Sequence, residues 1–286
     1  MLLPAGFLFL FYGCFTMFKI DSNLFDIGRM DTLATGDTPL HHLDPRAKLI
    51  TTLVFIVAVV SFGKYEVSAM IPFFIFPLVQ IAYGDLPLTY LLRKVMIVSP
   101  FAIFVGIFNP LLDREILFHF GSIGISGGWV SYLSILMRFT LTVMAALTLI
   151  ALTGFNTVCL ALEKLAVPKP FVVQLLFLYR YIFVLTDEAA RLMRARSLRV
   201  FESKGMGFKP FASMVGHLLL RTLDRAQRIH LAMCCRGFEG HIPILRPMRF
   251  GIREVIYVAA WTMVFTLLRF YNLPMKLGLF ITGLFT

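Results

Sequence analysis

The chain has 286 residues, of which 58% are hydrophobic and 15% charged, and its formal net charge is +11. Soluble domains carry about 45–50% apolar and about 25% charged residues, so this composition excludes an ordinary soluble protein and predicts an integral protein of the lipid bilayer. The net positive charge alone could suggest nucleic-acid binding, but its distribution argues against it. Of the 27 Lys and Arg residues, 13 lie within residues 186–253, between apolar segments. The positive-inside rule expects such a cluster in a cytoplasmic loop.

Residues 1–48 are predicted to form an N-terminal segment in two parts. Residues 1–18 are apolar but lack the positively charged start of a signal peptide. We interpret residues 1–16 either as untranslated, with Met17 as the start, or as a peripheral helix. Residues 20–48 are polar, and the adjacent His41 and His42 are interpreted as part of a solvated linker rather than as metal ligands.

Five apolar stretches predict transmembrane helices, so the expected fold is an all-α, polytopic membrane protein. Their ranges are 49–62, 67–83, 95–112, 129–153 and 255–268. Arg46 and Lys48 place the start of the first stretch on the cytoplasmic side. That stretch is short, and we expect the flanking Lys48 and Lys64 to snorkel. Arg138 lies inside the fourth stretch and is interpreted as a structural residue.

The connections carry weaker signals. Pro100 and the Asn109-Pro110 pair are expected to bend or end the third stretch. Loose alternation at residues 117–121 and 123–125 predicts a small hairpin on the outer face. Residues 273–286 are apolar but short, and either extend the bundle or fold back.

Two further helices are expected in the basic region. One covers residues 171–185, which are too short and interrupted for a confident span, and continues along the inner interface to Arg199. The other covers about residues 210–235, with an apolar face, an arginine face and Gly237 as its end. The apolar face of this helix is formed by Leu219, Leu223, Ala226, Ile229 and Met233, and the arginine face by Arg221, Arg225 and Arg228.

The predicted organisation of the whole chain is therefore an N-terminal segment (1–48), a four-span bundle (49–153), a coupling module (154–253) and a C-terminal span (254–286).

A short pattern, A-x-x-x-R-x-F-E, occurs twice in the basic region. Its first copy runs from Ala195 to Glu202 and its second from Ala232 to Glu239. Each copy places an alanine one turn before an arginine, Arg199 or Arg236, near a helix end. An exposed guanidinium there suits charge-assisted hydrogen bonds to carboxylates or helix C-terminal carbonyls of a partner. Small neighbours allow a partner backbone to approach; they are Ser197, Ala232 and Gly237.

The sequence predicts no catalytic, metal or cofactor site. It contains no G-x-x-x-x-G-K-[ST] phosphate loop. The predicted spans carry no set of His, Asp or Glu that could hold a first-row metal ion. The cysteines have no C-x-x-C spacing, and we interpret them as small packing residues; they are Cys14, Cys159, Cys234 and Cys235.

The chain resembles the transmembrane T component of energy-coupling factor transporters, most closely the cobalt/nickel branch called CbiQ. The resemblance rests on the segment from Leu43 to Leu49 and on two motifs of the Ala-Arg-Gly type. The second motif is close, with Cys235 where the family usually has alanine before Arg236 and Gly237. The first is looser: Leu198-Arg199-Val200 stands in its place, and Ala195-Arg196-Ser197 also has an Ala-Arg-small form. Either Arg199 or Arg196 is therefore the first contact, and the internal repeat favours Arg199.

The resemblance implies a membrane scaffold rather than an enzyme. It implies that the two motifs end coupling helices that dock into two CbiO-like ATPase subunits, and that ATP hydrolysis occurs there. It also implies a CbiM-like capture subunit with a small CbiN-like subunit. The implied cargo is cobalt or nickel, and cobalt would feed cobalamin synthesis. The implied location is the cell inner membrane, with the basic region on the cytoplasmic side. Two alternatives remain: a T component serving a vitamin transporter, and a self-sufficient carrier.

Overall fold

The computed structural model describes residues 28, 30–112, 116–120, 123–199, 208–240 and 250–270. The chain divides into two compact units. One comprises Asp31–Ala161 and Arg246–Thr286, and we call it the bundle unit. The other comprises Met1–Met30 and Leu162–Leu245, and we call it the two-helix unit after its two long helices.

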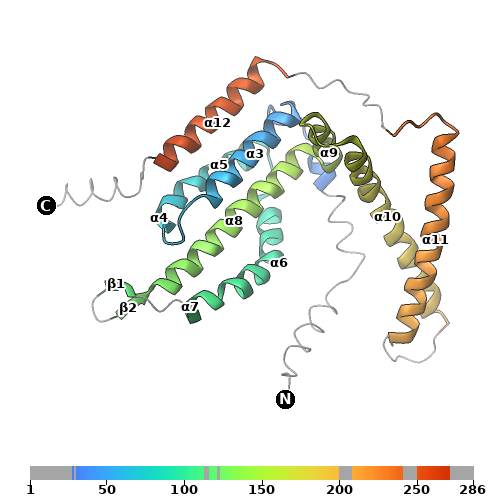
Figure 1. The fold of residues 1–286 in the computed structure, drawn as a ribbon, viewed down its shortest axis with the longest axis horizontal. Coiled ribbons are helices and arrows are strands. Elements are labelled where there is room, and N and C mark those ends of the chain that lie inside the picture. Colours follow the sequence, from blue (N-terminus) through green and yellow to red (C-terminus); the bar gives the residue numbers. More distant parts are fainter. Residues whose placement is uncertain are drawn as a thin grey trace. The chain divides into compact units, whose positions relative to one another are not determined.

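The bundle unit contains most of the secondary structure (Figure 1). Its elements are α3 (Pro45–Val60), α4 (Val67–Met70), the 3₁₀ helix η1 (Ile71–Phe74), α5 (Ile75–Tyr83), α6 (Leu88–Gly106), α7 (Phe108–Leu112), β1 (Ile116–Phe120), β2 (Ile123–Ser126), α8 (Gly127–Thr153) and α12 (Ile252–Phe270). The two strands pair antiparallel, which confirms the small hairpin. A further helix, α9 (Phe155–Lys164), starts in this unit and crosses the boundary into the other. The all-α, polytopic class predicted from composition is confirmed.

Local chemistry determines where α3 starts. The Asp44 side chain caps the helix by accepting the backbone N–H of Arg46 at 2.9 Å, and Pro45 occupies the first turn. Proline fits there because its missing N–H has no helical partner to lose. The hydroxyls of Thr51 and Thr52 donate to backbone carbonyls one turn earlier, each at 2.8 Å. These bonds satisfy two buried polar side chains inside an apolar helix.

Two cations join α3 to α8 at opposite ends. Lys48, near the start of α3, is only 2% exposed and donates to the carbonyl of Leu152 at the end of α8, at 3.2 Å. Arg138 of α8 donates to the carbonyls of Phe62 and Gly63, just beyond the end of α3, at 2.9 and 2.7 Å. The two helices therefore run antiparallel. Arg138 has the structural role expected of it, whereas the expectation that Lys48 snorkels is wrong, because its ammonium caps a buried helix end.

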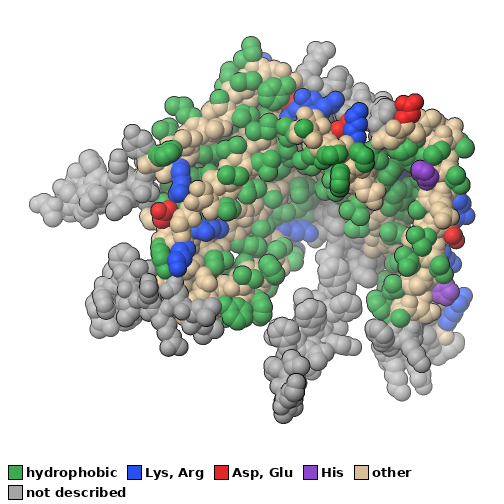
Figure 2. Space-filling view, in the orientation of Figure 1, with side chains coloured by type: hydrophobic (Ala, Val, Ile, Leu, Met, Phe, Trp, Pro, Cys, Tyr) green, Lys and Arg blue, Asp and Glu red, His purple; other side chains and the backbone are tan. Residues whose placement is uncertain are grey.

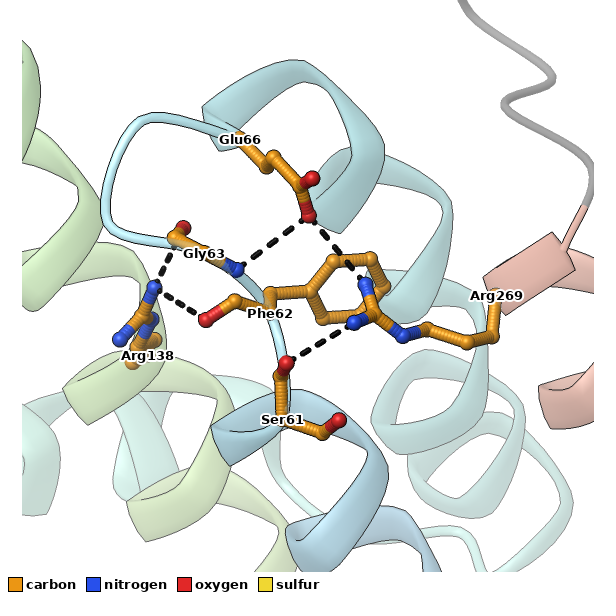
Figure 3. A network of polar contacts seen from close by, with 6 residues as sticks. All are labelled: Ser61, Phe62, Gly63, Glu66, Arg138 and Arg269. Atoms are coloured by element: carbon orange, nitrogen blue, oxygen red, sulfur yellow. Dashed lines mark hydrogen bonds and ion pairs between the residues drawn. The ribbon is translucent and has the colours of Figure 1, made fainter.

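Figure 3 shows that the turn after α3 is held by a second arginine as well. Arg269 of α12 donates to the carbonyl of Ser61 at 2.9 Å and forms an ion pair with Glu66 at 3.2 Å. Its guanidinium also lies 4.2 Å from the centre of the Phe62 ring. The same Glu66 carboxylate accepts the backbone N–H of Gly63 at 3.3 Å. Arginines from α8 and α12 thus bind backbone carbonyls of one turn.

An aromatic core anchors α12 in the bundle unit. The Phe55 ring of α3 stacks on Phe76 of α5, with ring centres 4.6 Å apart. Phe265 of α12 lies edge-on to Phe76 at 5.2 Å and is buried. Leu141 and Ala145 of α8 pack against this cluster. Because aromatic rings remove large apolar areas from solvent, this cluster fixes α12 beside α3 although they lie near opposite ends of the chain.

The helices differ in places from the expected spans. The second stretch is divided into α4, η1 and α5, because Pro72 has no N–H to continue an α-helical ladder. Helix α6 begins at Leu88, earlier than expected, and continues through Pro100. It ends at Gly106, before the Asn109-Pro110 pair that was expected to end it.

Three described helical segments are long and apolar enough to cross a membrane: Leu88–Pro110, which includes α6 and the start of α7, Gly127–Thr153 and Lys169–Arg196. The third differs from expectation in one respect: residues 171–185 were expected to be too short for a span, whereas the whole helix is long and apolar enough to be one. Its continuation beyond residue 185 was expected and extends to Ser197. Helix α3 has only 16 residues, and α12 carries charges at both of its ends. A total of five spans therefore stays a prediction. The expectations for residues 1–16 and 273–286 lie outside the described residues.

Two helix ends as a candidate docking site

The two-helix unit is built on α10 (Lys169–Ser197) and α11 (Phe208–Cys234). Helix α10 starts after Pro168 with Pro170 in its first turn, which fits the preference of proline for that position. Arg221 of α11 pairs with Glu188 of α10 at 2.7 Å. Residues early in α10 share a groove with residues late in α11, so the two helices run in opposite directions (Figure 1). Lys and Arg side chains gather along α11 (Figure 2).

Helix α11 ends in a Schellman motif. The N–H of Phe238 donates to the carbonyl of Met233 at 3.1 Å, and the N–H of Gly237 donates to that of Cys234 at 3.0 Å. Gly237 has a φ of +77°, a left-handed conformation that glycine adopts without steric cost. The prediction that Gly237 ends this helix is therefore confirmed, and the residue immediately before it, Arg236, is exposed.

Helix α10 ends at the equivalent position of the repeat. Its last residue, Ser197, corresponds to Cys234 in the second copy. The N–H of Arg199 donates to the carbonyl three residues earlier at 2.9 Å, and the N–H of Arg236 does the same at 2.9 Å. Val200, the counterpart of Gly237, lies outside the described residues. The two copies thus share a hydrogen-bonding register as well as a sequence pattern.

The two arginines lie at opposite ends of the helix pair. Because α10 and α11 are antiparallel, Arg199 follows one end and Arg236 follows the other. A helix of 27 residues such as α11 is about 40 Å long at 1.5 Å per residue. This separation suits contact with two bodies rather than one.

The other predicted site residues surround these ends. Ala195, Ala232 and Cys235 are exposed. Arg196 is partly buried, whereas Arg199 is exposed, and this difference supports Arg199 as the first contact. The backbone of Ser197 is described as the last residue of α10, while its side chain lies outside the described part. Among the residues that the structure describes, no group of three or more His, Cys, Asp or Glu is placed to hold a metal ion.

The specific contacts between α10 and α11 were not predicted from the sequence. Arg221 and Arg225 were expected on a face away from the apolar one, but Arg221 reaches Glu188 and Arg225 borders the groove. The signal that could have found the pairing is the apolar spacing in α10. Its groove-lining side chains recur every three or four residues, as an interhelical face requires; they are Gln174, Phe177, Leu178, Tyr181, Val184 and Leu185.

The chain is similar to known membrane transport components. A family model described as CbiQ, cobalt transport protein, matches residues 36–245. An uncharacterized protein of Methanocaldococcus jannaschii is 26% identical, covering 77% of this chain and 78% of that protein. The energy-coupling factor transporter transmembrane protein EcfT of Bacillus subtilis is 25% identical, covering 72% of this chain and 82% of its own, and that of Ruminiclostridium cellulolyticum is 26% identical, covering 80% and 91%. The family match includes both helix ends, and the chain belongs to the CbiQ family of transmembrane components of energy-coupling factor transporters.

Proposed function

We propose that this chain is the membrane scaffold and energy-coupling subunit of a cobalt or nickel uptake transporter, and that two ATPase subunits of the CbiO type dock at Arg199 and Arg236. The observation that carries the proposal is the matched register of the two arginines at opposite ends of an antiparallel helix pair. In this assignment α10 lies along the inner interface of the membrane rather than across it, so that both helix ends of the two-helix unit lie on the cytoplasmic side of the cell inner membrane.

The chemistry of docking follows from the guanidinium group. Its planar fork donates several hydrogen bonds at once and stays charged at all physiological pH values. A carboxylate or a set of helix C-terminal carbonyls on each ATPase is the matching acceptor. At the α11 end, Gly237 has no Cβ, and a Cβ built there would meet no atom within 4 Å. A partner backbone can therefore come close to this end.

Energy coupling then becomes a mechanical task. When two ATPase subunits move relative to each other on ATP binding and hydrolysis, they move the two helix ends that they hold. The contact between Glu188 and Arg221 joins the helices, so the displacement reaches the whole pair and passes to a CbiM-like capture subunit, with a small CbiN-like subunit. ATP hydrolysis belongs to the ATPase partners, and this chain catalyses no reaction.

The identity of the transported cargo is a separate and more specific part of the proposal. The family description names cobalt transport, which favours a divalent metal ion delivered by the capture subunit and, for cobalt, used in cobalamin synthesis. The relatives named EcfT carry no cargo in their names, so a T component for vitamin transport stays the second candidate. Uptake of labelled cobalt, nickel and vitamins by cells that carry the complete transporter separates the two candidates.

The docking proposal is tested with the double variant Arg199→Ala/Arg236→Ala in the assembled complex. We expect the variant to insert into the membrane, to lose most ATPase co-purification and to lose uptake. Arg191→Ala and Arg228→Ala are matched controls, because these exposed arginines lie on the same helices away from the ends. Full ATPase binding and full uptake by the double variant would show that docking lies elsewhere.

A further inference from the structure

An apolar groove of about 470 Å³ runs between α10 and α11. This volume falls within the range of about 300–1,000 Å³ that is usual for ligand sites. From α11 and the residues after it, the groove is lined by Thr222, Leu223, Arg225, Ala226, Ile229 and Met233, together with His230 and Phe238. Four of the five residues predicted as the apolar face of α11 are therefore turned into this groove, and only Leu219 is not.

One edge of the groove is basic. Arg221, Arg225 and Arg228 follow one another at intervals of four and three residues, so they form a stripe along one side of α11. Within the described residues these three guanidinium groups differ in surroundings. Arg221 is paired with Glu188, Arg228 is exposed and does not line the groove, and Arg225 is exposed and does line it. A cation thus stands at the border of an apolar space.

This arrangement selects an amphipathic anion. The apolar walls exclude a fully charged ligand, and the guanidinium of Arg225 favours a phosphate at the rim. Helix α10 also exposes large apolar side chains outside the groove, among them Phe171 at 67% and Ile182 at 42%. Because the chain is a membrane protein, a phospholipid is the apolar anion that surrounds it at the highest concentration.

We propose that the groove between α10 and α11 binds the acyl chain of an anionic phospholipid, with the lipid phosphate held by Arg225. The site is separate from the docking ends: Arg225 lies well inside α11, three turns before Arg236. This lipid proposal rests on the membrane location of the chain and does not depend on ATPase docking or on the identity of the cargo. The lipid fills the space between the two helices beyond their Glu188–Arg221 contact, and so helps to hold them at a fixed angle.

The test measures lipid binding by the purified full-length chain. The protein is reconstituted into vesicles of phosphatidylcholine mixed with phosphatidylglycerol and then extracted gently, and the retained lipids are identified by native mass spectrometry. We expect phosphatidylglycerol to be enriched. Arg225→Gln should lower its retention about fivefold, the factor that follows from losing one arginine contact with an anionic lipid. Arg228→Gln, which removes the same charge outside the groove, should retain it like the unaltered chain.

A second pair of variants tests the acyl-chain part of the site. Ala226→Phe places a ring in the groove and should reduce the retention of phosphatidylglycerol and of phosphatidylcholine alike. Ala212→Phe adds the same ring at an exposed position of α11 that does not line the groove, and should change neither. All variants are compared as monodisperse protein, so that loss of folding is detected separately.

Three results would overturn the proposal. Equal retention by Arg225→Gln and Arg228→Gln would mean that charge acts only through the general basicity of α11. Unchanged lipid content in Ala226→Phe would mean that no acyl chain enters the groove. Cross-linking from a cysteine at Ala226 to a membrane helix of a transporter partner, with no bound lipid, would assign the groove to that helix. Inorganic phosphate alone is expected to leave lipid retention unchanged.

Discussion

Arg199 and Arg236 occupy the same position relative to the ends of their helices. Each lies two residues beyond the last helical residue, and each donates its backbone N–H to the carbonyl three residues earlier, at 2.9 Å in both cases. A four-residue pattern can recur in a sequence by chance. Within the described part of the first copy, which ends at Arg199, the pattern recurs together with this hydrogen bond, so the two helix ends match up to that residue.

The left-handed turn at Gly237 gives the first prediction. Gly237→Ala should destabilise the α11 end by about 1–2 kcal/mol, because an L-residue is strained at positive φ, and it should weaken ATPase co-purification. The Cβ of the introduced alanine would have open space around it, so the loss of stability comes from the backbone conformation and not from a steric clash. Gly216→Ala is the matched control: it lies inside α11 with equally open surroundings and should stabilise the helix by about 1 kcal/mol. Thermal unfolding and co-purification together check both.

Much of the fold follows from local sequence features. The apolar stretches predicted most helices, and the Asp44-Pro45 pair marks the start of α3, since its side-chain cap and missing N–H act within one turn. The continuation of α10 beyond residue 185 was expected, but its capacity to span a membrane was not, because Arg180, Asp187 and Glu188 interrupt its apolar pattern. Those charges are tolerated because the helix is amphipathic, and Glu188 has a partner on α11.

The candidate site was predictable in part for the same reason. Arg236 and Gly237 carry a helix-end signature that can be recognised in one segment. The groove and the contact between Glu188 and Arg221 depend on how two helices pack, which no local window contains. Burial of Lys48 is a similar case. Next to an apolar stretch, lysine is expected to extend toward solvent, but here a free carbonyl at the end of α8 binds it.

The contact between Lys48 and Leu152 gives the second prediction. Lys48→Met should lower the stability of the bundle unit by about 1–3 kcal/mol, because the buried carbonyl of Leu152 loses its charged donor. Lys64→Met removes the same charge from an exposed residue in the turn after α3 and should change stability by less than about 0.5 kcal/mol. Thermal unfolding in detergent measures both. Equal losses would show that the bond of Lys48 contributes no net stability.

The turn bound by Arg138 and Arg269 gives the third prediction. Arg138→Met removes two bonds to carbonyls, and Arg269→Met removes one such bond and the Glu66 ion pair. Each substitution should lower the free energy of unfolding by about 1.5–3 kcal/mol, the usual contribution of hydrogen bonds to charged donors. Because both arginines hold one turn, the double variant should lose less than the sum of the two single losses. Strict additivity in the double-mutant cycle would contradict a shared role.

Close packing of α6 on α8 gives the fourth prediction. A Cβ built on Gly106 would lie 2.8 Å from a ring carbon of Tyr132, so Gly106→Ala forces the helices apart. Overpacking of this kind costs about 1–3 kcal/mol, and small residues are the usual means by which membrane helices approach closely. Tyr132→Leu should restore part of the stability in the double variant. Gly63→Ala is the control, since its Cβ would meet only Glu66 atoms at an ordinary 3.5 Å.

His41, in the polar segment before α3, gives the last prediction. Its Nε2 lies 3.1 Å from the carbonyl of Leu33, and its Nδ1 lies 2.7 Å from the Thr38 hydroxyl. A neutral ring satisfies both contacts by donating to the carbonyl and accepting from the hydroxyl.

Burial lowers the pKa of His41 below its usual value. Lys48 and His42 act in the same direction, while the Leu33 carbonyl and Asp37 oppose the shift. A lowered folded-state pKa means that the unfolded chain binds the proton more readily. The contribution to stability is therefore complete above the unfolded pKa of about 6.5 and is lost as the pH falls toward the folded value.

We accordingly expect the thermal midpoint of the full-length chain to fall as the pH is lowered below about 6.5, and His41→Gln to flatten that dependence. His42→Gln is the matched control, because the neighbouring imidazole is exposed and bonds to the exposed Asp37. A pH profile that His41→Gln leaves unchanged, or that His42→Gln flattens equally, would assign the dependence to other groups.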